Sequence, residues 1–304
     1  MQIFYNSKDS TSILQPISVS TTDRSGGAPD DMAILLADPD GLLSTWSPKK
    51  GDTIRVLEGG YDTGIMYVDE VRQTAGYLNL AAISIPMTAR TSRSQGWENV
   101  RFLEIAAEIA GRYGLEIKPY GVVNHLYPRL DQIERPDFEF LSWLCQLEGY
   151  SCKVSGSLVI YDEHKQEQER PGLTIRKNSM RSFEFCDRST GIYSRCNVRG
   201  STPTGMVEGS FSDGQMVGPT LSVTLPIGSQ ADADRWAKGM LRSWNKQRVT
   251  GKITIDLNPG LAAGSMITIE DTGFFDGLYL VDAVAHEFAS NRSKLIVRRP
   301  LEGY

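Results

Sequence analysis

The sequence predicts a mainly β fold with an inserted α/β unit, in which one small β-barrel domain occurs twice. Short runs of β-branched and aromatic residues, separated by turn residues, fill both ends of the chain. Apolar residues at helical spacing occur only in the middle of the chain and near residues 230–246. A C-terminal stretch also repeats an N-terminal one. We therefore expect a first barrel at 1–93, an insert at 94–165 and a second barrel at 166–304 that contains the late helix.

The repeat is the most informative feature of the sequence. Residues 264–284 match residues 51–71 at an offset of 213, and seven of the 21 positions are identical without a gap. The positions on which the repeat depends most are Gly51, Gly64, Val68 and Asp69, matched by Gly264, Gly277, Val281 and Asp282. A strand-like run follows each copy, Tyr77–Ala81 and Lys294–Arg298. Internal repeats define the fold when they are real, but glycines at turns also match by chance.

Composition places the chain among ordinary globular proteins. It has 304 residues, 40% hydrophobic and 23% charged, with a net charge of −5. A basic stripe, which nucleic-acid binding would need, is not evident. No apolar run is long enough to cross a membrane. The four cysteines fit no zinc spacing and are interpreted as buried thiols in a reducing compartment, and we expect no cofactor or metal.

The first β unit alternates strands and turns. Residues 1–22 predict two strands around a turn, and Met32–Leu36 predicts a buried strand. The turn at Asp38-Pro-Asp-Gly is similar to the start of a calcium loop, but the twelfth position is Lys49 rather than an acid, so we reject calcium there.

The insert predicts two helices and a hairpin. The first helix would begin after Asn99 as its N-cap and end at Gly114, and the second would begin at Pro136 and end at Gly149. The hairpin would pair residues 150–154 with 158–161. The charged segment 162–170 predicts a solvated linker.

The last third of the chain is β-rich around one helix. Residues 200–219, rich in small residues, predict a mobile loop. Ser229 and Asp232 fit a capping box that opens the helix near 230–246.

Catalytic signatures are missing from the sequence. It has no nucleophile elbow, phosphate loop, dinucleotide fingerprint or His-Glu-x-x-His motif. His125, His164 and His286 lie in three different segments, and Cys145 has no histidine near it. The matched acids Asp69 and Asp282 more simply fix a turn or accept from backbone donors. A glycosidase-type acid pair stays open, because such pairs depend on geometry rather than on spacing.

The order of these elements resembles a known family. The resemblance rests on Trp46–Val56 with Val68–Val71, on the helical segments Phe102–Leu115 and Pro136–Tyr150 with Leu158–Tyr161, and on Pro259–Gly264 with Gly277–Val281, His286 and Leu295–Arg298. Together they are similar to the late control protein D family, the baseplate hubs of contractile phage tails. That family is related to the N-terminal part of type VI secretion VgrG spike proteins. One departure is Arg135 before Pro136-Asp137, where the family has a small polar residue.

The resemblance implies a structural role without catalysis. Such hubs are homotrimers whose two barrels per subunit form a pseudo-six-fold ring, which adapts a six-fold tail tube to a three-fold spike and leaves a channel. The implied partners are a tail tube or tube-initiator protein, a central spike, other baseplate or wedge proteins and, as a further candidate, the tape measure protein. DNA would be only passing cargo. The implied location is the virion tail baseplate, assembled in the host cytoplasm.

Two other functions remain open from the sequence alone. One is a peptidoglycan-degrading tail hydrolase with a β-rich wall-binding module, and the other is a monomeric glycan-binding β module. The first would need a catalytic carboxylate, and the second would act without oligomerisation.

Overall fold

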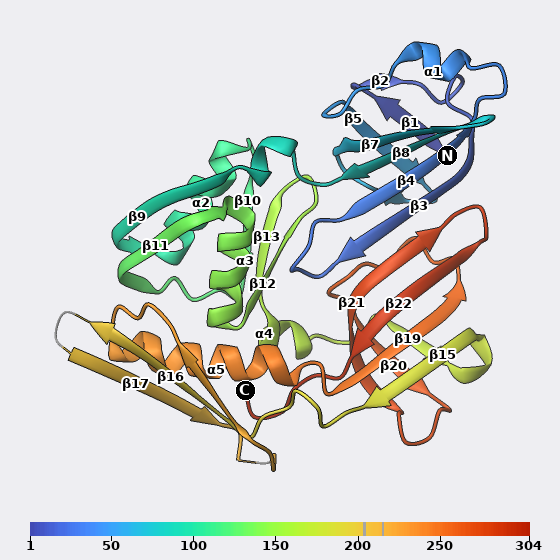
Figure 1. The fold of residues 1–304 in the computed structure, drawn as a ribbon. Helices are drawn as coiled ribbons and strands as arrows, with labels where there is room; N and C mark the ends of the chain where they lie inside the picture. The colour runs from blue at the N-terminus through green and yellow to red at the C-terminus, as the bar shows by residue number, and fades with distance from the viewer. Residues whose placement is uncertain (203–204, 215) are drawn as a thin grey trace.

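The computed structural model describes residues 1–202, 205–214 and 216–304 (Figure 1). It is mainly β, as predicted. Figure 1 shows two groups of long strands on one side of the molecule, with the insert and a long helix on the other. Most of the long strands belong to one 14-stranded sheet, which we divide into an N-terminal and a C-terminal sheet half.

The N-terminal sheet half has the strand order β3-β4-β8-β7-β5-β1-β2. Each neighbouring pair in this order is antiparallel. Alternate residues face one core, as in Met32, Ile34 and Leu36, because side chains alternate across a strand. Its elements are β1 Gln2–Tyr5, β2 Lys8–Asp9, β3 Pro16–Arg24, β4 Asp31–Ala37, α1 Leu42–Trp46, β5 Thr53–Glu58, β6 Tyr61–Asp62, β7 Met66–Thr74, β8 Tyr77–Ile83 and η1 Met87–Arg90.

The C-terminal sheet half has the order β15-β19-β22-β21-β20-β14 and its own core. Its pairs are antiparallel except for β14 with β20. The two halves are joined because β21 also pairs with β3. The elements are β14 Leu173–Arg176, η2 Lys177–Ser179, β15 Met180–Asp187, β19 Val249–Asp256, β20 Met266–Glu270, β21 Gly277–Glu287 and β22 Arg292–Arg298.

The insert contains two small sheets and three helices. β9 pairs with β11, and β10, β13 and β12 form a three-stranded sheet. Its second long helix ends at Gly149 in the left-handed conformation, as predicted. The elements are β9 Ser92–Arg101, α2 Phe102–Arg112, β10 Ile117–Tyr120, β11 Leu126–Pro136, α3 Asp137–Glu148, β12 Tyr150–Val154, β13 Leu158–Asp162 and α4 Glu163–Glu167.

The late helix is present but packs differently from the prediction. α5 spans Gln230–Asn245 and begins at Ser229, whose hydroxyl accepts from the Asp232 backbone N–H. Its buried residues Trp236 and Leu241 share one hydrophobic core with the insert, not with the C-terminal sheet half. A separate sheet, in the order β17-β16-β18, packs on the same helix. Its strands are β16 Arg195–Thr202, β17 Gly205–Ser212 and β18 Thr220–Thr224.

The helix start predicted at Asn99 is wrong. Asn99 lies inside β9, and α2 begins at Phe102. The free N–H groups of its first turn are satisfied from elsewhere, because the Asn124 side chain accepts from the Leu103 N–H at 2.9 Å. Glu104 also reaches back to the Arg101 N–H at 2.7 Å. A capping residue distant in sequence thus replaces the local one that the pattern suggested.

Two segments that were predicted to be a loop and a linker contain regular secondary structure in part. Residues 200–219 contribute to β16 and β17, with positions 203–204 and 215 of the prediction outside the described residues. Gly209 is needed there because helix α5 lies close: a Cβ on Gly209 would be 2.2 Å from the Ala233 carbonyl carbon. The expected linker at 162–170 contains α4, whose Glu163 and Glu167 are buried.

The contact between α5 and α3 gives the first prediction. Gly239 of α5 lies so near the end of α3 that a Cβ would be 2.0 Å from the Leu147 carbonyl oxygen. Replacing Gly239 with Ala should cost about 1–3 kcal/mol of unfolding free energy, because backbone must move apart. A Cβ added to Gly111 in α2 would meet open space, so Gly111→Ala should gain about 0.5–1 kcal/mol. Urea unfolding of both variants measures this. Equal stability of the two variants would contradict the packing described.

Candidate functional site: the joint between the sheet halves

The two sheet halves meet where β21 pairs with β3, a contact that we call the joint. Residues Ala283–Glu287 lie antiparallel to Ser20–Arg24. Backbone hydrogen bonds extend it at both ends: the Ser25 N–H donates to the Asp282 carbonyl at 2.8 Å, and the Phe288 N–H to the Val19 carbonyl at 3.1 Å. The joint therefore makes one sheet of two halves that each have a separate core.

Asp23 ties the joint to its surroundings. It is buried, and its carboxylate accepts from the Ala263 N–H at 2.9 Å. Its other oxygen pairs with Lys153, from the β12–β13 hairpin of the insert. Tyr161 in the same hairpin donates to the Ser25 carbonyl at 2.9 Å. The insert thus contacts the joint through Lys153 and Tyr161. Burying the Asp23 carboxylate would cost free energy without the Ala263 N–H and the Lys153 ammonium group as donors.

A second ionic group lies where α4, α5 and β22 meet. This charge cluster balances three cations with three anions, and four of the six side chains are almost fully buried. Arg298 is at its centre, is 1% exposed, and lies 3.0 Å from an oxygen of Asp282 and 3.3 Å from one of Glu163. Its members are Glu163, Glu167, Arg242, Lys246, Asp282 and Arg298.

The pKa values in the charge cluster follow from burial and these contacts. Burial alone would raise the pKa of Glu163, but Lys246, Arg298 and Arg242 together hold it well below its usual range. For Asp282, burial outweighs the attraction of Arg298 and Lys246 and raises the pKa. The cluster therefore links the insert, through α4, to the last strand of the sheet.

The structure places one matched glycine and one matched valine of each sheet half in equivalent hydrogen bonds. The Gly51 N–H donates to the Val68 carbonyl at 2.8 Å, and the Gly264 N–H donates to the Val281 carbonyl at 2.8 Å. Gly51 and Gly264 both have φ of +88°, where glycine is favoured. Gly64 and Gly277, which also have positive φ, lie just before β7 and at the start of β21.

Strand pairing keeps the same offset of 213. Thr53 lies opposite Tyr67, and Met266 lies opposite Leu280. The strand predicted after each copy is present, because β8 contains Tyr77–Ala81 and β22 contains Lys294–Arg298. Val68 pairs with Ala82 and Val281 with Val297, an offset of 215 rather than the 217 that aligns Tyr77–Ala81 with Lys294–Arg298.

Asp69 and Asp282 occupy the same irregular place in their strands. The register of β7 against β8 shifts between Val68 and Glu70, and that of β21 against β22 shifts between Val281 and Ala283. Each acid lies at this bulge and forms an ion pair with an arginine, Asp69 with Arg90 at 2.8 Å and Asp282 with Arg298 at 3.0 Å. The sequence suggested a backbone role for these acids but not their arginine partners.

His286 and Cys145 are both buried in the structure. His286 is buried between the Ser293 hydroxyl at 2.9 Å and the Leu261 carbonyl at 3.1 Å, and burial lowers its pKa. Burial also raises the pKa of the Cys145 thiol, which makes it a poor nucleophile. All four cysteines are free, but the interpretation of them as buried thiols is wrong for Cys186, which is exposed. Within the described ranges, no three His, Cys, Asp or Glu side chains gather in a way that could hold a metal ion.

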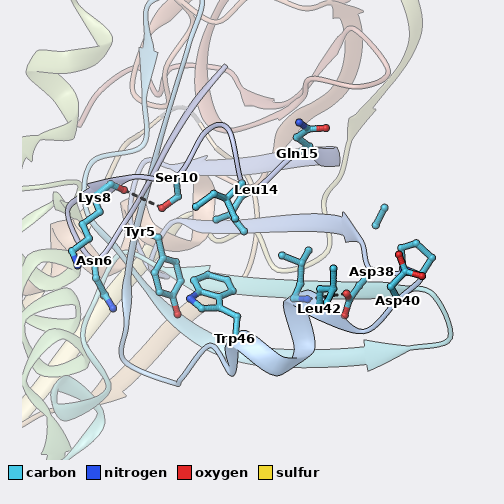
Figure 2. Close-up of a pocket in the computed structure, with 14 residues that line it drawn as sticks. Tyr5, Asn6, Lys8, Ser10, Leu14, Gln15, Asp38, Asp40, Leu42 and Trp46 are labelled. Carbon is cyan, nitrogen blue, oxygen red and sulfur yellow. Dashed lines mark hydrogen bonds between the residues drawn. The ribbon is translucent and has the colours of Figure 1, made fainter.

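A pocket of about 780 Å³ lies between the β1–β2 hairpin and α1 (Figure 2). Its wall is largely apolar: the rings of Tyr5 and Trp46 are 4.3 Å apart, and Leu42 is 72% exposed beside them. Of its acids, Asp38 accepts from the Leu43 N–H at 2.9 Å and so helps to begin α1. The pocket therefore has the character of an apolar groove.

Comparison with known proteins gives results only at the level of structure. No protein-family model matches the chain, and no curated protein matches it. A tail protein from Neisseria meningitidis MC58 is similar with a TM-score of 0.78 and 12% identity, over 98% of this chain and 95% of that one. The 43 kDa tail protein of prophage MuSo2 from Shewanella oneidensis gives 0.77 and 14%, over 98% of both chains.

A third solved structure connects the fold to secretion. The E. coli c3393 protein, described as a component of the type VI secretion system with similarity to the T4 phage tail proteins gp27 and gp5, gives a TM-score of 0.65 at 11% identity. The match covers 96% of this chain and 75% of that one. The chain thus has the fold of phage tail proteins over nearly its full length. More particularly, it is similar to the gp27-like baseplate hub and to the corresponding part of secretion spike proteins, which confirms the predicted resemblance.

No helix in the described part of the chain is long and apolar enough to span a membrane.

The charge cluster gives the second prediction. Glu163→Gln should cost about 3–5 kcal/mol at pH 7, because it leaves buried cations without their partner. Since the folded state holds the pKa of Glu163 below its unfolded value of about 4.3, its contribution is present above that pH and is lost as the pH falls below it. The difference between wild type and variant should therefore shrink below about pH 4.

Denaturant unfolding at several pH values measures this difference. The control is Glu270→Gln, which removes an exposed ion pair with Arg176 and should change stability little at any pH. A Glu163→Gln protein as stable as the control at pH 7 would show that the cluster contributes nothing net.

Proposed function

We propose that the chain is a structural baseplate hub of a contractile tail or a related injection machine, acting without catalysis. The fold is shared with phage tail proteins over nearly the whole chain. The observation that carries the proposal is the equivalence of the two sheet halves: matched residues make the same backbone hydrogen bonds, and the halves are joined edge to edge. A chain of this kind has two similar surfaces, so several copies could place these surfaces one after another around a ring.

The two halves are, in this proposal, a duplicated barrel-like domain. The matched pairs Gly51/Gly264 and Val68/Val281 define one turn and strand, and the bulges at Asp69 and Asp282 define the bend that follows. A bulge bends its strand, so bulges at matching positions give the two sheet halves similar curvature. This supports a role for Gly51, Gly64, Val68, Asp69, Gly264, Gly277, Val281 and Asp282 as the positions that keep the two halves alike.

Three copies of such a chain would form a pseudo-six-fold ring with a channel. One face of that ring would dock a six-fold tail tube or tube initiator, and the other would dock a three-fold spike. The insert would lie outside and contact wedge or other baseplate proteins. The net charge of −5 suits a channel through which DNA or an effector passes without binding, because cationic walls would hold phosphate. The proposed location is the tail baseplate of the particle.

The hydrophobic cores support a refinement of the domain boundaries. We propose sheet domains near 1–93 and 166–304 and an insert at 94–165, as the sequence suggested, with one change. The strands β16, β17 and β18 and the helix α5 share the core of the insert. The middle domain is thus built from two separate segments of chain, and the second sheet domain is interrupted by the second of them.

The third prediction concerns oligomeric state. Multi-angle light scattering at increasing concentration, with negative-stain imaging, should give three times the mass of the chain and ring-shaped particles. A hydrolase would instead degrade purified peptidoglycan, and a glycan-binding module would bind glycan as a monomer. A protein that stays monomeric at every concentration, and that is missing from the baseplate of its assembled particle, would contradict the proposal.

A further inference from the structure

The joint uses strand β3 from the N-terminal sheet half and strand β21 from the C-terminal one. In each half, the strand that corresponds to the other half's joint strand has an unpaired edge: β7 in the N-terminal half and β15 in the C-terminal half. β15 pairs with β19 on one side, and among the described strands nothing pairs with its other side. β7 pairs with β8 along its length, but β5 covers only Met66 and Tyr67 on the other side. Residues 70–74 of β7 are therefore an open edge within the described part of the chain. Bare edges of this kind attract further strands.

These two bare edges are the counterparts of the two strands of the joint. β7 corresponds to β21 through the offset of 213. β15 corresponds to β3 by its place in the sheet. In the N-terminal half, successive cross-strand pairs through β4 and β8 connect Ser20 to Glu70. In the C-terminal half, successive pairs through β19 and β22 connect Glu184 to Ala283. Glu70 and Ala283 are 213 residues apart, so Ser20 corresponds to Glu184 at an offset of 164.

The sequence supports the offset of 164 independently. It aligns Asp23-Arg24-Ser25 with Asp187-Arg188-Ser189, which are identical. It also aligns Gly27 with Gly191, whose φ angles are +83° and +77°. In the first copy this tripeptide forms the joint, because Asp23 and Arg24 lie opposite Val284 and Ala283 and the Ser25 N–H donates to Asp282. In the second copy it lies on the bare end of β15.

We propose that β15 of one copy of this chain pairs antiparallel with β7 of a second copy, in the register of the joint. This places Arg188 opposite Glu70, Asp187 opposite Val71, and Cys186 opposite Arg72. The proposal rests on the hub function and supplies the contact that would close its ring. Each copy offers a different edge to each neighbour, so the contact repeats head to tail and can close into a ring.

Charge at the two edges favours this partner. Glu70 is exposed, and in the proposed register it faces Arg188, an opposite charge at a cross-strand position. In the joint, Asp23 accepts from the Ala263 N–H, and the counterpart of Ala263 at the offset of 213 is Lys50. Asp187 would therefore meet the backbone N–H of a lysine. A second copy of the chain thus offers both a matching strand and opposite charges.

A disulfide test follows from the exposed native Cys186. Arg72→Cys should form a disulfide with Cys186 of the neighbouring copy under oxidised glutathione, because paired strands place Cα atoms about 4.5–5.5 Å apart, within disulfide range. Non-reducing gels should show linked dimers and trimers that reductant converts to monomer. Arg72 is exposed, so the variant should fold.

Two matched controls define the register. Gln73→Cys lies one residue along, with its side chain on the other face of the sheet, and should link far less. Cys186→Ser in the Arg72→Cys protein should abolish the link. A trimer by light scattering in which Arg72→Cys links no more than Gln73→Cys overturns this contact but leaves the hub function standing. A protein that is monomeric at every concentration contradicts both, and a link from Arg72→Cys only to a different protein of the particle overturns the contact.

Charge reversal gives a second readout. Glu70→Arg and Arg188→Glu, each alone, should weaken self-association roughly two- to five-fold, since like charges then face each other across the strands. The double variant should recover most of the loss. Two single variants whose effects simply add in the double variant would overturn the proposed pairing of these residues.

Discussion

The pairing of β21 with β3 is the interaction on which the rest of the structure depends. Each sheet half has its own hydrophobic core, and this joint is the place where their strands pair into one sheet. Backbone hydrogen bonds fix the register, and the buried Asp23 fixes the joint against Ala263 and Lys153. Edge pairing transmits curvature from one sheet to the next, which a contact between side chains alone would not do.

The insert makes specific contacts with the two joined sheet halves. Its hairpin supplies Lys153 and Tyr161 to the joint, and α4 supplies Glu163 and Glu167 to the charge cluster around Arg298. The core of the insert is completed by α5, which belongs to the later part of the chain. The sheets and the insert are therefore interlocked in sequence and connected by buried ionic contacts.

Sequence patterns identified the parts that depend on local chemistry. Alternating apolar residues predicted the mainly β fold, and Gly149 and Ser229 marked helix ends correctly. Prediction failed where a partner comes from far along the chain. The acids of α4 were predicted to be solvated, because their partner Arg298 is more than a hundred residues away in the sequence. The role of the second Asp-Arg-Ser could not be inferred from the sequence, because it depends on the pairing of β3 with β21.

A high-resolution reconstruction of the assembled oligomer tests the central claim most directly. We expect β15 of one copy to lie about 4.8 Å from β7 of the next, with the contact superposing on the internal joint of β3 and β21. The six joints around the ring, three within chains and three between them, would then be alike. Finding β15 and residues 70–74 of β7 facing solvent or a different protein in that oligomer would contradict the proposed ring contact.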